Sequence, residues 1–150
     1  MPRSARLGLK GSSRARTCQA AIRTLRATAA LAWPDPWRAL TSLYSLFPTT
    51  RDILRRYGPG VAQAKRHGQT SFGLLAVTIL NNALRPLLSV WHPRLQDYED
   101  QRPATATRVE WEASWSEINA LRRAIDEVRT TINQYADLLA DVAEVPNLHR

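Results

Sequence analysis

The sequence predicts an all-α protein: a single helical bundle with a long C-terminal heptad-patterned helix and a disordered basic N-terminal arm. Three observations predict this class. Apolar residues recur at helical spacing in several segments, capping residues and prolines separate those segments, and no pair of matching strand-like runs is evident. With 150 residues, of which 44% are hydrophobic, the chain has the size of one domain and can build a core.

Residues 1–32 are expected to form the flexible arm, partly helical from about residue 14. The arm contains no acid and seven basic residues: Arg3, Arg6, Lys10, Arg14, Arg16, Arg23 and Arg26. Such a segment can be a nucleic-acid arm, a membrane-surface helix, a targeting peptide or a loose tail. The sequence alone leaves these readings open.

The bundle domain is expected over residues 33–145, followed by a tail over 146–150. Its first helix is predicted over residues 36–47, because Asp35 is a good N-cap and Pro36 suits the first helical position. Pro48 stops or kinks this helix, and a second helix follows over residues 50–57. Gly58, Pro59 and Gly60 are predicted to end that helix, and residues 61–70 form a polar connector.

A third helix is predicted over residues 71–92, with Ser71 as its cap. The run from Phe72 to Leu84 is apolar almost all round, which is typical of a helix at the centre of a bundle. Its 13 residues before Arg85 are too few to span a bilayer, so no membrane-spanning helix is expected. Pro86 should kink or interrupt the helix near Asn82, and residues 97–107 read as a polar linker.

The last helix, predicted over residues 107–144, carries the clearest pattern in the chain. Nine of ten heptad a and d positions are apolar or aromatic. Position a holds Trp111, Ile118, Ile125, Ile132 and Leu139, and position d holds Ser114, Leu121, Val128, Tyr135 and Val142. Trp115, Ala124, Leu138 and Ala143 widen the stripe, which favours packing against several helices over a free two-stranded coiled coil.

The charge is distributed unevenly, and this bears on what covers the heptad stripe. Residues 1–96 carry 15 Lys and Arg against two acids, whereas residues 97–150 carry six Arg against 11 acids. In the preferred interpretation the helices of one chain cover the stripe, and the acids of the last helix meet the basic front half: Glu110, Glu112, Glu117, Asp126, Glu127, Asp137 and Asp141. A self-pairing or partner-binding coiled coil is the alternative.

No catalytic, metal or cofactor site is predicted. His67, His92 and His149 lack the spacing of metal ligands, and the single cysteine, Cys18, cannot form an internal disulfide. The sequence contains no phosphate-binding glycine loop and no nucleophile elbow. The protein is therefore not expected to be an enzyme, and no small-molecule substrate is inferred.

The best candidate for a partner-binding site is a set of four residues: Asn81, Arg85, Trp91 and His92. Asn81 and Arg85 lie one turn apart on an otherwise apolar helix, where polar groups are costly unless they are paired. The functional interpretation is a polar notch that receives a carboxylate, a phosphate or a partner residue. In the structural alternative, Arg85 pairs with an acid of the last helix, and Trp91 and His92 pack at a helix end.

We therefore expect a non-enzymatic helical interaction module, an adaptor or accessory subunit in the cytoplasm, that associates with a protein partner or with its own copies. The alternative is a nucleic-acid-binding accessory protein, since a basic cluster over residues 51–66 adds to the arm. Nine residues would bind the polyanion: Arg14, Arg16, Arg23, Arg26, Arg51, Arg55, Arg56, Lys65 and Arg66. Binding of a membrane surface through residues 14–32 is a third possibility.

Overall fold

The protein is all-α. The computed structural model describes residues 4–30, 35–62 and 71–143, and within these ranges no strand occurs. In chain order the helices are α1 (Ser4–Ala30), α2 (Pro36–Tyr44), α3 (Leu46–Ala62), α4 (Phe72–Ile79), the π-helical turn η1 (Leu80–Leu84), α5 (Arg85–Glu99), α6 (Arg108–Ala113) and α7 (Ile118–Ala143).

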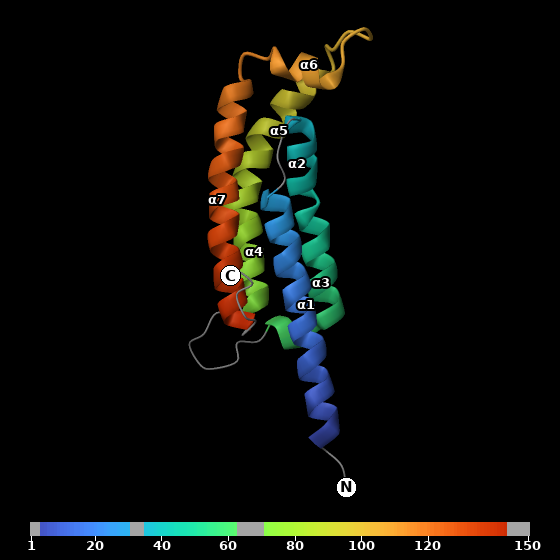
Figure 1. The fold of residues 1–150 in the computed structure, drawn as a ribbon, viewed down its shortest axis with the longest axis vertical. Helices are drawn as coiled ribbons and strands as arrows, with labels where there is room; N and C mark the ends of the chain where they lie inside the picture. The colour runs from blue at the N-terminus through green and yellow to red at the C-terminus, as the bar shows by residue number, and fades with distance from the viewer. Residues whose placement is uncertain (1–3, 31–34, 63–70, 144–150) are drawn as a thin grey trace.

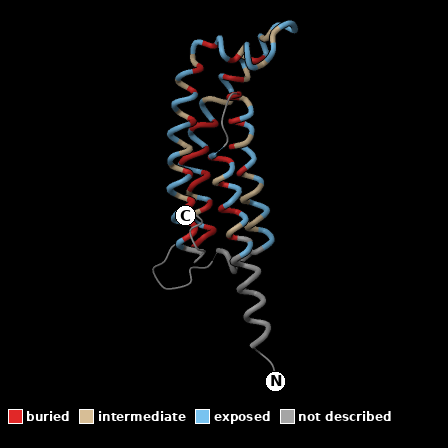
Figure 2. The backbone as a smooth tube through the Cα atoms, in the orientation of Figure 1, coloured by how far each residue is buried: buried red, intermediate tan, exposed pale blue. Residues whose placement is uncertain are grey.

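The long helices lie side by side, and their contacts form a closed ring (Figure 1). Helix α1 packs on α7 and α3, while α4 packs on the same two helices from the other side. Beyond the end of α1, helix α2 occupies the position that α1 holds lower in the bundle, and it contacts α5 and α7. Buried residues follow the inner side of these helices (Figure 2), so the apolar core runs along the length of the molecule.

The flexible arm predicted over residues 1–32 is not confirmed, because α1 is one helix from Ser4 to Ala30. Its second half belongs to the core: Cys18, Ile22, Leu25 and Ala29 are buried. These are the residues whose helical spacing the sequence shows. Arg26 donates to Asp137 of α7 at 2.7 Å, so part of the arm's positive charge is used inside the fold.

Helix α2 begins as predicted. The Asp35 carboxylate accepts a hydrogen bond from the Arg38 backbone N–H at 3.1 Å, and Pro36 occupies the first turn. The predicted stop or kink at Pro48 occurs slightly earlier: α2 ends at Tyr44, Ser45 forms a turn, and α3 begins at Leu46. Pro48 thus lies in the first turn of α3, where a missing N–H costs little.

The end of α3 also differs from the prediction, since the helix continues through residues 58–60 to Ala62. A residue before proline is normally pushed out of the helical region by a clash that involves its Cβ atom. Gly58 has no Cβ atom, which reduces this clash. Most of the predicted polar connector, residues 63–70, lies outside the described residues.

Helices α4, η1 and α5 form one continuous run, capped by Ser71, whose Oγ accepts from the Leu74 N–H at 3.1 Å. Pro86 does interrupt regular α-helix: η1 is a wide turn in which the Arg85 N–H donates to the Leu80 carbonyl, five residues back. The helix then passes Pro93 and ends at Glu99, beyond the predicted residue 92.

This run bears on the expectation that no helix spans a membrane. Phe72–Glu99 is 28 residues long, and its most apolar window has a mean hydropathy of 1.4, so length and composition alone would allow it to cross a bilayer. In the fold, 39% of that window is buried among the other helices. Because the core helix of a soluble protein meets the same criteria, the expectation stays a prediction.

The single helix predicted over residues 107–144 is wrong, since α6 and α7 are separated by a turn at residues 114–117. The Trp111 carbonyl, which would accept from the Trp115 N–H in a continuous helix, is bound instead by the Tyr98 hydroxyl at 3.0 Å and the Ser114 hydroxyl at 2.7 Å. The Trp115 N–H turns to the Glu112 carbonyl at 3.1 Å.

Within α7 the predicted stripe faces the other helices. Five heptad residues are buried there: Ile118, Leu121, Ile125, Ile132 and Leu139. Val128 and Tyr135 are half-buried, whereas Leu138, expected to widen the stripe, is 50% exposed. Ala136 and Ala140 are buried in its place, so the buried face is centred slightly away from Leu138.

Candidate functional site

The wide turn η1 places two predicted site residues on the surface of the molecule. Asn81 lies within the turn and Arg85 directly follows it, and both side chains are exposed. The Arg85 side chain makes no ion pair or hydrogen bond with the residues that the structure describes. The structural alternative, in which Arg85 pairs with an acid of the last helix, is therefore not what the fold contains.

Two hollows adjoin Arg85 and share three lining residues, Phe47, Arg51 and Arg85. The first hollow has a volume of about 420 Å³ and is completed by Tyr44, Leu88, Ser89, His92 and Pro93. The second has a volume of about 480 Å³ and is completed by Thr50, Leu54, Arg55, Val77, Leu80 and Asn81. The two hollows adjoin at these shared residues between the α2–α3 and α4–α5 segments, and we call them together the basic groove.

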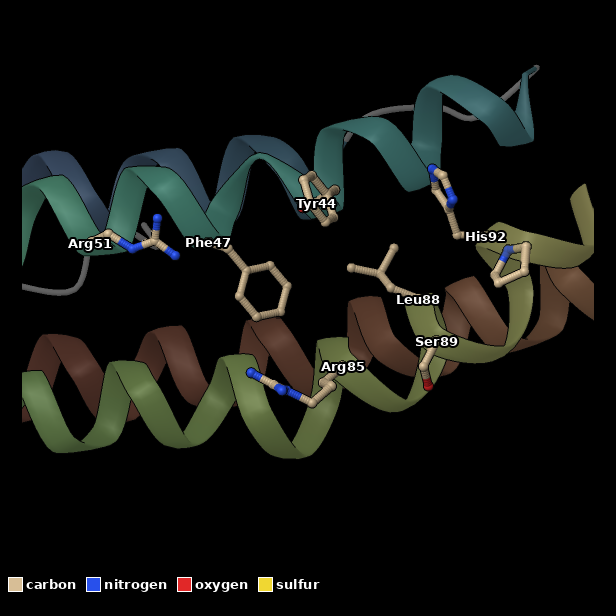
Figure 3. A pocket seen from close by; sticks show the side chains of 8 residues that line it. Tyr44, Phe47, Arg51, Arg85, Leu88, Ser89 and His92 are labelled. Carbon is tan, nitrogen blue, oxygen red and sulfur yellow. The ribbon is translucent and has the colours of Figure 1, made fainter. Parts of the chain in front are cut away.

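The basic groove combines an apolar lining with cationic groups. Figure 3 shows Phe47 projecting between the two helical segments, with Arg51 on one side of it and Arg85 on the other. The large aromatic side chain of Tyr44, at the end of the groove near His92, is 61% exposed. The groove therefore offers aromatic surface and positive charge to a ligand at the same place.

Three arginines line the groove without a partner of opposite charge among the described residues: Arg51, Arg55 and Arg85. Other arginines are paired: Arg94 with Glu117 at 2.9 Å, and Arg102 and Arg108 both with Glu99 at 3.2 Å. What distinguishes the groove is that its cations line hollows that also have apolar and aromatic walls.

His92 closes one end of the groove with its ring against two aromatic side chains. Its centroid lies 5.5 Å from that of Trp37 and 6.4 Å from that of Tyr44. The half-buried imidazole thus belongs both to the groove lining and to the packing of α2 on α5.

The structure brings three of the four predicted partner-binding residues to the groove: Asn81, Arg85 and His92. Trp91 lies elsewhere. Its ring meets Trp115 edge-on at 6.2 Å, and the Arg94 guanidinium lies 5.6 Å from its centroid. Trp91 therefore packs against the segment that leads into α7.

The residues predicted to bind a polyanion do not form one group. Arg51 and Arg55 line the groove, and Arg56 is exposed on the same helix. Arg16 and Arg23 are exposed on α1, whereas Arg26 is bonded to Asp137. Lys65 and Arg66 lie outside the described residues, and so does the side chain of Arg14.

A second notable site, which the sequence analysis missed, is a group of buried carboxylates where α6 meets α2 and α5. Glu112, which the sequence analysis placed among the acids that meet the basic front half, is 1% exposed. Its Oε2 accepts from the Trp37 N–H at 3.4 Å, and its Oε1 has no hydrogen-bond partner in the described structure. Asp35 and Glu99 are buried nearby.

This environment makes Glu112 unusually hard to ionise. Burial raises its pKa from the ordinary 4.5 to about 7, and the negative charge of Asp35 adds to the effect. The Trp37 N–H at the start of α2 opposes the rise, Glu99 adds to it, and the Arg108 cation opposes it. The only sequence signal for this site is the number of acids near residues 97–112, which equally describes a solvated surface.

The arrangement of these acids does not resemble a metal centre, and the described ranges contain no group of three or more His, Cys, Asp or Glu side chains placed to hold a metal ion. Comparison of the chain with protein-family models, with curated proteins and with solved structures gives no match. The fold and the groove thus define an all-α protein with a basic, aromatic-lined surface depression.

Proposed function

We propose that the protein is a non-enzymatic interaction module in which the helices form a single bundle and the basic groove binds a helical segment of a partner protein. The ring of α1, α7, α4 and α3 supports the bundle, since the buried residues of α7 lie along it. The module would act as an adaptor or accessory subunit by helix-in-groove association.

The observation that carries the proposal is that the two hollows adjoin at Phe47, Arg51 and Arg85. From Tyr44 to Arg55 the groove follows 12 residues at the end of α2 and in α3, or roughly 17 Å for the rise of 1.5 Å between successive residues. This length suits about three turns of a bound helix. Exposed aromatic and arginine side chains are also the types enriched at protein interfaces.

The nucleic-acid alternative has weaker support. Arg51, Arg55 and Arg56 are exposed on α3, as phosphate binding requires, but the neighbouring groove surface is apolar. Arg26 of the predicted arm is already bonded to an acid of α7. A steep loss of DNA affinity with rising salt, unchanged by alterations of Tyr44, would favour this alternative.

The proposal is tested by placing a photo-crosslinking amino acid at Ser89, an exposed residue of the groove lining, in the full chain within its native cells. We expect a discrete crosslinked product with one segment of one protein, located to single residues by mass spectrometry. The Tyr44→Glu variant is expected to remove this product, because a carboxylate replaces exposed aromatic surface in the groove.

Leu138→Glu is the matched control, since Leu138 is 50% exposed on α7 and does not line the groove. This variant should leave the product unchanged. Crosslinking at Ser89 that survives Tyr44→Glu, or that Leu138→Glu abolishes equally, would show that the groove does not bind the partner. Circular dichroism confirms that both variants are folded.

A further inference from the structure

The facing arginines of the basic groove indicate the chemistry of its partner. Arg51 comes from α3 and Arg85 from the start of α5, and both line both hollows beside Phe47 (Figure 3). Neither forms an ion pair with a described residue. Two cations held on either side of one depression repel each other until an anion lies between them.

Apolar surface flanks this arginine pair in both directions along the groove. Leu88 follows Arg85 by three residues and lines the hollow that contains Tyr44. Leu54 follows Arg51 by three residues and lines the other hollow. Because α3 and the α4–α5 run point in opposite directions (Figure 1), these leucines lie about one helical turn to either side of the arginines.

A second polar position lies on the same side of the pair as Leu54. Arg55 is one turn beyond Arg51, and Asn81 is one turn before Arg85, so both line the second hollow. Along the groove, the apolar surface at Leu88 is therefore followed by the Arg51–Arg85 pair. Apolar surface at Leu54 comes next, together with a further cation, Arg55. A helical ligand matches this order when it carries an acid with apolar residues about one turn to either side, and a second acid beside the apolar residue on the side of Arg55 would add to the match.

We propose that the groove binds an acidic amphipathic helix, with one Asp or Glu carboxylate between Arg51 and Arg85 and apolar side chains three or four positions to either side. This inference rests on the proposed function and specifies its partner. Arginine favours carboxylates because its planar guanidinium can donate two parallel hydrogen bonds.

The charge of the whole chain favours a different acidic protein over a second copy. The chain carries a formal net charge of +8, so two copies repel each other at long range, whereas an acidic partner is attracted. Asp137, one of the acids that α7 exposes, is already bonded to Arg26 of its own chain. An acidic helix of another protein is therefore the occupant to which the proposal commits.

The test is a selection on the intact protein from a display library of randomised helical peptides of about 16 residues, a length slightly greater than the groove. Peptides selected on the wild-type protein are expected to share an acid with apolar residues three or four positions before and after it. On an Arg51→Glu/Arg85→Glu double variant, the same position is expected to select Lys or Arg.

The matched control is Arg122→Glu/Arg123→Glu, which makes the same change in net charge at two exposed residues of α7. It should keep the preference for an acid. For a single selected peptide, we expect the groove double variant to weaken the affinity at least about tenfold, as measured by fluorescence anisotropy, and the control variant to change it much less.

The outcomes separate this inference from the proposed function. Apolar peptides that compete for the groove but show no acidic position would overturn the inference and leave the groove as a docking site. If no selected peptide loses affinity on Tyr44→Glu, both fail. If duplex DNA or anionic phospholipid vesicles bind and are lost in the groove double variant while no acidic pattern is selected, the partner is a polyanion and the inference is wrong.

Discussion

The Leu139→Ala variant is expected to unfold at a clearly lower urea concentration than the wild-type protein, with a loss of about 2–5 kcal/mol in the free energy of unfolding. Leu139 is 0% exposed and, with Leu25, Leu46 and Phe72, surrounds a small void between α1, α3, α4 and α7. Truncation to alanine removes packing against the other three helices, and the interior is too densely packed to close over the gap.

Leu138→Ala provides a matched control because it makes the same chemical change one residue earlier. Leu138 is 50% exposed, so its replacement is expected to alter the free energy of unfolding by about 0.5 kcal/mol or less. Both variants are measured by urea denaturation followed by circular dichroism, with the slope of the transition checked for constancy. Equal losses in the two variants would mean that the inner face of α7 is not packed as described.

The Glu112→Gln variant is expected to be more stable than the wild-type protein at pH 8, by about 3 kcal/mol, and equally stable at pH 4.5. The pKa of Glu112 is about 7 in the folded protein, against an ordinary value of 4.5. Each unit of difference corresponds to about 1.4 kcal/mol. Glutamine has nearly the same shape and keeps an oxygen that can accept from the Trp37 N–H.

The sign of this effect follows from proton binding. Between pH 4.5 and pH 7 the unfolded chain has lost the Glu112 proton, whereas the folded protein still holds it. The free energy of unfolding contributed by Glu112 therefore falls as the pH rises through this interval and stays low above it. Glutamine does not titrate, so the variant lacks this fall.

The measurement compares urea denaturation of the two proteins at pH values from 4.5 to 8. Glu127→Gln serves as the control, because Glu127 is an exposed glutamate of α7 and its replacement should leave the pH profile nearly unchanged. Parallel profiles for wild type and Glu112→Gln would show that Glu112 ionises as easily in the folded protein as in the unfolded chain.

Local signals in the sequence were enough to place several helix ends and the buried face of the last helix. The Asp35 and Ser71 side chains each cap a helix by accepting a hydrogen bond from the backbone N–H three residues later in the chain. Such a cap can be predicted because both partners lie close together in the sequence. The spacing of Ile118, Ile125 and Ile132 likewise depends only on the helical repeat. Such features need no knowledge of the neighbouring helices.

The features that the sequence did not reveal depend on residues far apart in the chain. The break after α6 requires the Tyr98 hydroxyl to reach the Trp111 carbonyl, 13 residues away. The burial of Glu112 requires the start of α2, 75 residues away in the sequence. In α1, basic composition suggested an arm, but packing against α7 outweighs composition once Cys18, Ile22 and Leu25 face a partner helix.

Only part of the candidate site could be predicted from the sequence, because the site combines residues that lie far apart in the chain. Asn81 and Arg85 stand out because polar groups interrupt an apolar run. Arg51 was predicted only as part of the basic cluster over residues 51–66, and Phe47 carries no local signal, since an aromatic residue on an amphipathic helix is ordinary. Only the antiparallel approach of α3 to the α4–α5 run combines them with Arg85 into one groove.

The wide turn at Leu80–Leu84 has a consequence for how this helix could change over evolution. A π-helical turn holds about one residue more than an α-helical turn, so it accommodates a single inserted residue while the helix on either side stays in phase. In a regular α-helix the side chains of Ile79 and Leu87 would point about 80° apart, whereas here both are buried. Loss of one residue within the turn would therefore restore a regular helix and keep Leu87 on the buried side, whereas the same loss elsewhere in the run would rotate one end of the helix relative to the core.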